Sequence, residues 1–170
     1  MAGRRYPSLI WRGGCLLFIF FLSVALFPVT SLEIRDKKED RVLYSRRISS
    51  GDRFEFIYFH SVDKTPVRGY FLITPDKRIQ PIETRFQSYG PGLPSTEKHT
   101  LREGKELKVK SEGIVMERFS FFVSPMTRQT FIFKGDSIDF SPFQEGAMID
   151  IEVTFRPLFL EVFFSHGRSY

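Results

Sequence analysis

The chain has a single cysteine in 170 residues, Cys15, and it lies within an apolar N-terminal run. The remainder of the chain can therefore form no disulfide and must be stabilised by its hydrophobic core. A lipid anchor on Cys15 is not predicted either, because such a cysteine should follow the apolar run rather than open it.

Familiar catalytic and metal-binding patterns are also lacking. The sequence contains no G-x-S-x-G, no H-E-x-x-H and no phosphate-binding P-loop. Neighbours in a strand point to opposite faces, so His60 and Ser61 cannot act together as base and nucleophile. Potential soft-metal ligands are present, but none stands at a ligand spacing: His60, His99, His166, Met116, Met126 and Met148. We therefore predict no enzymatic activity, no metal and no cofactor.

Acidic residues are missing from positions 1–31, where three arginines precede a charge-free run from Cys15 to Val29. A basic segment, a short apolar run and small residues at its exit are typical of an export signal. The run is shorter than the roughly 20 residues that span a bilayer. The pattern predicts a signal peptide over residues 1–31 with cleavage before Leu32, or alternatively an uncleaved membrane anchor. Both interpretations place residues 32–170 outside the cytoplasm.

The exported part is nearly neutral. Without the three leader arginines, 22 basic and 20 acidic side chains remain, a formal charge of +2. This balance gives no indication of a nucleic-acid-binding surface.

Phenylalanine is abundant, and 16 of the 20 lie after residue 31. Apolar and polar residues alternate over 53–62 and 148–155, with turn residues recurring about every 8 to 12 positions. The pattern predicts an all-β fold, either an antiparallel β-sandwich or a partly closed barrel, in one domain over residues 42–170. Phe56 and Ile151 should be buried in central strands. Residues 32–41 are predicted to be a charged tether.

Two polar segments are candidates for function. Residues 60–67 (HSVDKTPV) end an apolar strand, and residues 89–94 (YGPGLP) hold two glycines and two prolines. A hairpin through Thr74–Lys77 should return the chain and bring the segments together at one end of the sheet. The predicted partner- or ligand-binding residues are His60, Ser61, Asp63, Lys64, Gly90, Gly92 and Leu93. The alternative is structural: a tight strand connection and a rigid loop.

The same two segments resemble the bacterial family of unknown function numbered 1850. In that family a His-Ser-Val stretch leads to Thr/Ser-Pro-Val, and a Tyr/Phe-Gly-x-Gly-Leu-Pro element follows. The residues that match are His60, Ser61, Val62, Lys64, Thr65, Pro66, Val67, Phe86, Ser88, Gly90, Gly92, Leu93 and Pro94. The resemblance spans about Arg41 to Phe155, and Gly69 departs from it where an acidic residue is expected.

The resemblance implies a small exported protein of the kind often encoded beside tripartite solute transporters of the TAXI type. It carries no established activity, but it implies an accessory role in uptake with a transporter component as partner. We therefore expect an exported, non-enzymatic interaction domain at the outer face of the cytoplasmic membrane. The first alternative is a small-carboxylate or metal-binding module that uses residues 60–66 and 89–94, and the second is an uncharacterised hydrolase.

Overall fold

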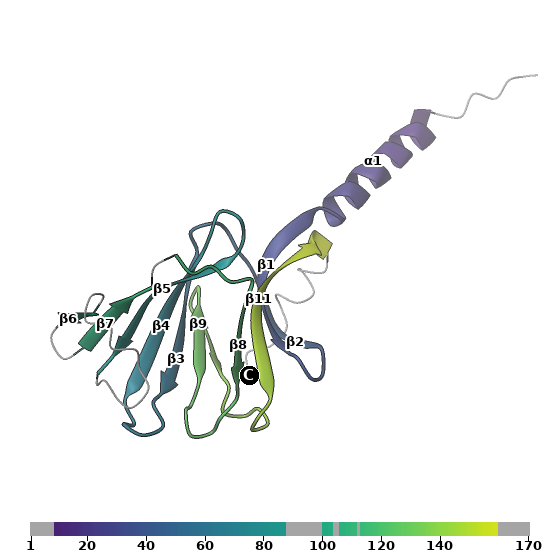
Figure 1. Ribbon diagram of the computed structural model, residues 1–170. Helices are drawn as coiled ribbons and strands as arrows, with labels where there is room; N and C mark the ends of the chain where they lie inside the picture. Colours follow the sequence, from purple (N-terminus) through teal and green to yellow (C-terminus); the bar gives the residue numbers. More distant parts are fainter. Residues whose placement is uncertain (1–8, 88–99, 104–105, 112, 160–170) are drawn as a thin grey trace, which may run out of the picture.

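The fold is an all-β sandwich preceded by one helix (Figure 1). The computed structural model describes residues 9–87, 100–103, 106–111 and 113–159. Helix α1 spans Leu9–Ala25 and extends away from the sandwich. Among the described residues, none of the helical segments combines the length and hydropathy needed to cross a bilayer.

The described strands form two antiparallel sheets. The four-stranded sheet has the order β2-β1-β11-β8. Its strands are β1 (Pro28–Asp36), β2 (Arg41–Arg47), β8 (Arg118–Phe122) and β11 (Met148–Pro157). The seven-stranded sheet has the order β10-β9-β3-β4-β5-β7-β6. Its strands are β3 (Arg53–Phe59), β4 (Pro66–Ile73), β5 (Ile79–Phe86), β6 (Thr100–Glu103), β7 (Glu106–Lys110), β9 (Thr130–Phe133) and β10 (Asp136–Asp139).

The core lies between the two sheets and is rich in phenylalanine. Phe56 of the seven-stranded sheet packs against Phe119 and Phe121 of the other, with ring centroids 5.1 and 4.6 Å apart. Phe54 stacks on Phe71 of the neighbouring strand at 4.7 Å. Such large side chains bury enough apolar area to stabilise a domain of this size without a disulfide. The fully buried apolar side chains of the four-stranded sheet are Leu32, Ile34, Ile149 and Ile151.

Several sequence predictions are confirmed. β3 lies between β9 and β4, and β11 lies between β1 and β8, so both strands are central. Phe56 is 5% exposed and Ile151 is fully buried. The hairpin around Thr74 also forms, with Ile73 opposite Ile79 and Arg68 opposite Arg85. The fold is a sandwich and not a closed barrel.

The prediction of a tether over residues 32–41 is wrong. β1 begins at Pro28 and pairs with β11 over nine residues, while β2 pairs on its other side. The segment DKKED is the β1–β2 turn, where Asp36 Oδ1 accepts the backbone N–H groups of Lys38 and Glu39. The charges of β1 made this strand hard to predict, because two of their partners, Glu152 and Arg156, lie on β11, far away in the sequence.

Two side chains that the alternation placed inward are exposed. Val62 lies in the turn after β3, because the strand ends at Phe59, and it is 64% exposed. Phe155 lies near the end of β11, opposite Thr30 rather than over the core, and it is 68% exposed.

Candidate functional site

The first candidate segment is a turn closed by its own backbone. β3 ends at Phe59 opposite Pro66, where β4 begins. The His60 amide donates to the Thr65 carbonyl, and the His60 carbonyl accepts the Lys64 amide, both at 2.9 Å. Lys64 has a φ of +54°, a left-handed conformation that is costly for a residue with a side chain. The turn therefore holds a defined, strained shape.

The His60 side chain faces into this turn. Its Nδ1 accepts the backbone N–H of Asp63 at 3.2 Å, and the Asp63 carboxylate lies 3.6 Å from the same nitrogen. The imidazole is 13% exposed. Because an acceptor Nδ1 carries no proton, the neutral ring holds its hydrogen on Nε2. His60 and Asp63 thus stabilise the turn through contacts within it.

The other residues of this turn face solvent. Ser61 and Lys64 are exposed, and Val62 is 64% exposed between them. The three present a hydroxyl, an apolar side chain and an ammonium group on a constrained backbone. This combination can contact a partner that offers apolar surface and a carboxylate.

The second candidate segment, with Gly90, Gly92 and Leu93, lies outside the described residues. The described end of β5 does reach the predicted end of the sheet. Phe86 packs with Val67 of β4 and Leu107 of β7 in a small cluster beside Tyr58. Burial raises the pKa of the Tyr58 phenol in this cluster. Whether residues 89–94 join His60 stays a prediction.

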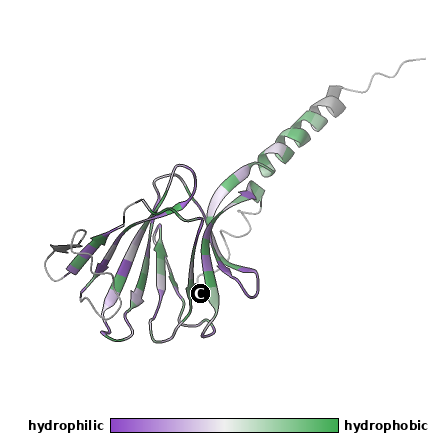
Figure 2. Cartoon of the chain, viewed as in Figure 1, coloured by the Kyte–Doolittle hydropathy of each residue, from purple (hydrophilic) through white to green (hydrophobic). Residues whose placement is uncertain are grey.

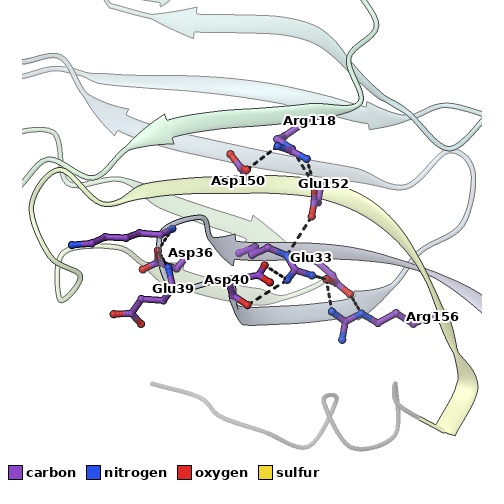
Figure 3. Close-up of polar contacts among 10 residues, drawn as sticks. Glu33, Asp36, Glu39, Asp40, Arg118, Asp150, Glu152 and Arg156 are labelled. Atoms are coloured by element: carbon purple, nitrogen blue, oxygen red, sulfur yellow. Dashed lines mark hydrogen bonds and ion pairs between the residues drawn. The ribbon is translucent and has the colours of Figure 1, made fainter.

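A second polar site, which the sequence did not reveal, lies on the face of the four-stranded sheet opposite the core (Figure 3). We call it the charged cluster, and it consists of Glu33, Arg35, Arg118, Asp150, Glu152 and Arg156. β1 and β11 place Glu33 directly opposite Glu152, and β8 places Arg118 beside Glu152 on the other side. Like charges opposite one another are destabilising unless cations lie between them.

Arg35 lies between the two opposed glutamates. Its guanidinium is 3.1 Å from Glu33 Oε2 and 3.4 Å from Glu152 Oε1, and it donates to Asp40 Oδ1 at 2.7 Å. Burial lowers the pKa of Arg35, but the Asp40 hydrogen bond and the nearby carboxylates outweigh it and raise the pKa above its ordinary value. The guanidinium therefore stays charged.

The two other arginines complete the cluster. Arg118 contacts Asp150 Oδ2 at 3.1 Å and Glu152 Oε2 at 2.9 Å. Arg156 donates to Glu33 Oε2 at 2.8 Å, and its Nε forms an ion pair with Oε1. Three guanidinium groups thus pair with four carboxylates, those of Glu33, Asp150 and Glu152 in the cluster and that of Asp40 beside it. Each of these carboxylates already has a guanidinium partner, so the cluster serves to join β1, β11 and β8.

The described residues offer little for other chemistry. No group of three histidine, cysteine, aspartate or glutamate side chains within them could hold a metal ion. Ser120 lies at the edge of the charged cluster, where its hydroxyl donates to Asp150 Oδ1 at 2.7 Å. The exposed tip of the turn, formed by Ser61, Val62 and Lys64, is therefore the best candidate for binding.

Comparison with protein families places about half of the chain in a known family. The family model described as Domain of unknown function (DUF1850) matches residues 54–140, about half of the chain. The match includes the turn after β3 and most of the seven-stranded sheet, but not α1, β1, β2 or β11. No curated protein and no solved structure matches the chain.

Proposed function

Because the chain belongs to the DUF1850 family, we propose that it is an exported, non-enzymatic interaction domain that assists a tripartite solute transporter of the TAXI type. The domain works at the outer face of the cytoplasmic membrane. It contacts a transporter component through the tip of the turn after β3, Ser61, Val62 and Lys64.

One observation carries this proposal: within the family-matched region, the turn uses His60 and Asp63 for its own stability and leaves its tip exposed. A base in an active site needs a ring nitrogen directed at substrate. The Nδ1 atom of His60 already accepts a backbone hydrogen bond. A constrained, exposed tip is typical of a recognition loop, because little conformational entropy is lost when it binds.

The partner surface follows from the chemistry of the tip. Lys64 favours an acidic side chain, and Val62 favours a shallow apolar depression beside it. An exposed apolar residue and a rim cation together provide modest affinity and electrostatic steering. This suits a transient contact.

Co-purification of the transporter from membranes tests the proposal. Val62→Asp and Lys64→Glu should each reduce the amount of transporter subunit recovered with the tagged full chain. Lys38→Glu in the exposed β1–β2 turn is the matched control, since it makes the same charge change elsewhere. Recovery that is unchanged by both tip variants, in chains of unchanged melting temperature, would contradict the proposed contact.

A further inference from the structure

The predicted cleavage site before Leu32 lies inside β1, because the connection between α1 and the sandwich is very short. Only Leu26 and Phe27 separate α1 from β1. Cleavage before Leu32 would cut β1 internally and remove Pro28–Ser31, four of the nine residues paired with β11. It would also remove Val29 and Ser31, which are 4% and 0% exposed.

Backbone hydrogen bonds also tie this stretch to the domain. The Thr30 carbonyl accepts the Ile48 amide, and the Phe27 carbonyl accepts the Leu158 amide, each at 2.9 Å. Losing half of a central strand would leave the facing groups of β11 without partners in the sheet. The folded domain therefore requires residues that the predicted cleavage would remove.

The helix that would then be retained is apolar around its whole circumference. Seven consecutive side chains, Leu16–Leu22, are each 47–69% exposed, and successive residues are turned by about 100°. No charged residue occurs between Gly13 and Leu32. A protein groove covers one stripe of a helix, whereas lipid surrounds every side. Figure 2 shows this apolar character along α1.

The apolar surface continues from α1 onto the domain. Leu26 and Phe27 are 53% and 61% exposed. Phe155 and Phe159, near the other end of the sequence, are 68% and 41% exposed. The pairing of Pro28 with Pro157 brings the end of β11 to the base of the helix (Figure 1). A small groove there is lined by Ser23, Val24, Phe27 and Leu158.

We propose that the mature protein keeps α1, and that α1 and an apolar collar of Leu26, Phe27, Phe155 and Phe159 form one lipid-binding surface. The sandwich then sits with this end on the bilayer and its opposite end away from it. Leucine and phenylalanine side chains at the base of an apolar helix are of the kind that proteins bury at the boundary between headgroups and acyl chains. The inference rests on the proposed export of the domain, but not on its transporter partner.

Site-specific labelling of the full chain tests this surface. Cys15→Ser removes the only native thiol, and Phe155→Cys then carries an environment-sensitive fluorophore. Phe122→Cys is the matched control, because Phe122 is 63% exposed on the same sheet but lies opposite Met148, at the end away from α1. The proteins are reconstituted in vesicles of phosphatidylcholine and phosphatidylglycerol whose acyl chains carry doxyl quenchers.

We expect the label at position 155 to be quenched several-fold more strongly than the label at 122. Intact mass of the chain isolated from membranes should show that residues 9–31 are present. Equal quenching at the two positions, or a chain that begins at Leu32, would overturn the inference. If Phe155→Cys fails to fold, Phe27→Cys provides the same measurement from the other side of the collar. Strong quenching without transporter co-purification would contradict the proposed function alone.

Discussion

Arg156 and Glu33 lie 123 positions apart in the sequence, yet they form a paired, largely buried contact between β11 and β1. The Glu33 side chain is fully buried, and that of Arg156 is 16% exposed. Glu33 Oε1 is neutralised by its ionic contact with the Arg156 Nε. The first strand of the sandwich is thereby held to the last.

Removing Arg156 should destabilise the domain strongly. Arg156→Ala leaves Glu33 buried with only Arg35 as a partner, and breaking a buried ion pair typically costs about 3 to 5 kcal/mol. Chemical unfolding of the full chain in detergent micelles measures the change. Arg41→Ala is the control, because Arg41 is 58% exposed and its pair with Glu39 should contribute less than about 1 kcal/mol. A double variant, Glu33→Leu with Arg156→Met, should cost less than Arg156→Ala alone.

Core truncation should separate buried from exposed phenylalanines. Phe56→Ala should lower the free energy of unfolding by about 3 to 5 kcal/mol, because it leaves a cavity against Phe119 and Phe121. Phe155→Ala makes the same chemical change at a residue that is 68% exposed, so it should cost much less. Similar losses for the two variants in micelles would contradict the described packing.

Acid should weaken the contact between Asp52 and Lys134. Burial raises the pKa of Asp52, but the hydrogen bonds from Lys134 and the Ser49 amide outweigh it and lower the pKa below its ordinary value. The carboxylate therefore contributes stability above its unfolded pKa of about 3.9, and this contribution is lost as the pH falls through the lower folded value.

Asp52→Asn tests this pH dependence. At neutral pH it should cost up to about 1 kcal/mol, since the pair is partly exposed, and the difference from the native chain should vanish in acid. Unfolding measured over a pH series gives both values. Glu39→Gln, whose carboxylate is 59% exposed, is the control for removing one surface negative charge. A constant Asp52→Asn difference down to low pH would contradict the assignment.

The sequence predicted the strands whose pattern is local. Phe54 and Phe56 alternate with less buried residues, and the Thr74 turn is followed by its own partner strand, so β3, β4 and β5 were readable. β1 could not be predicted in this way, because Glu33 and Arg35 look like surface charges in the sequence. Their burial is explained only when Glu152 and Arg156 lie beside them in the fold. No local pattern encodes a pairing across more than a hundred residues.

The candidate turn was located by sequence, but the roles within it were not. The residue types predicted one polar group containing His60, Asp63 and Lys64. Only the backbone path shows that the His60 Nδ1 faces the Asp63 amide while Lys64 points to solvent. The spacing of residue types in the sequence predicts which residues form a turn. The hydrogen bonds within the turn determine which of its side chains are exposed to a partner.

This division of roles gives the last prediction. His60→Ala removes the acceptor for the Asp63 amide and should lower the free energy of unfolding by about 1 kcal/mol. Lys64→Gly should leave the melting temperature equal or higher, because glycine adopts the φ of +54° without strain. Lys64→Gly should nevertheless reduce transporter recovery, since it removes the exposed ammonium.

A Lys64→Gly chain that melts normally and binds normally would show that the cation is dispensable. If His60→Ala instead melts like the native chain but loses binding, the imidazole itself contacts the partner and its role in the turn is secondary.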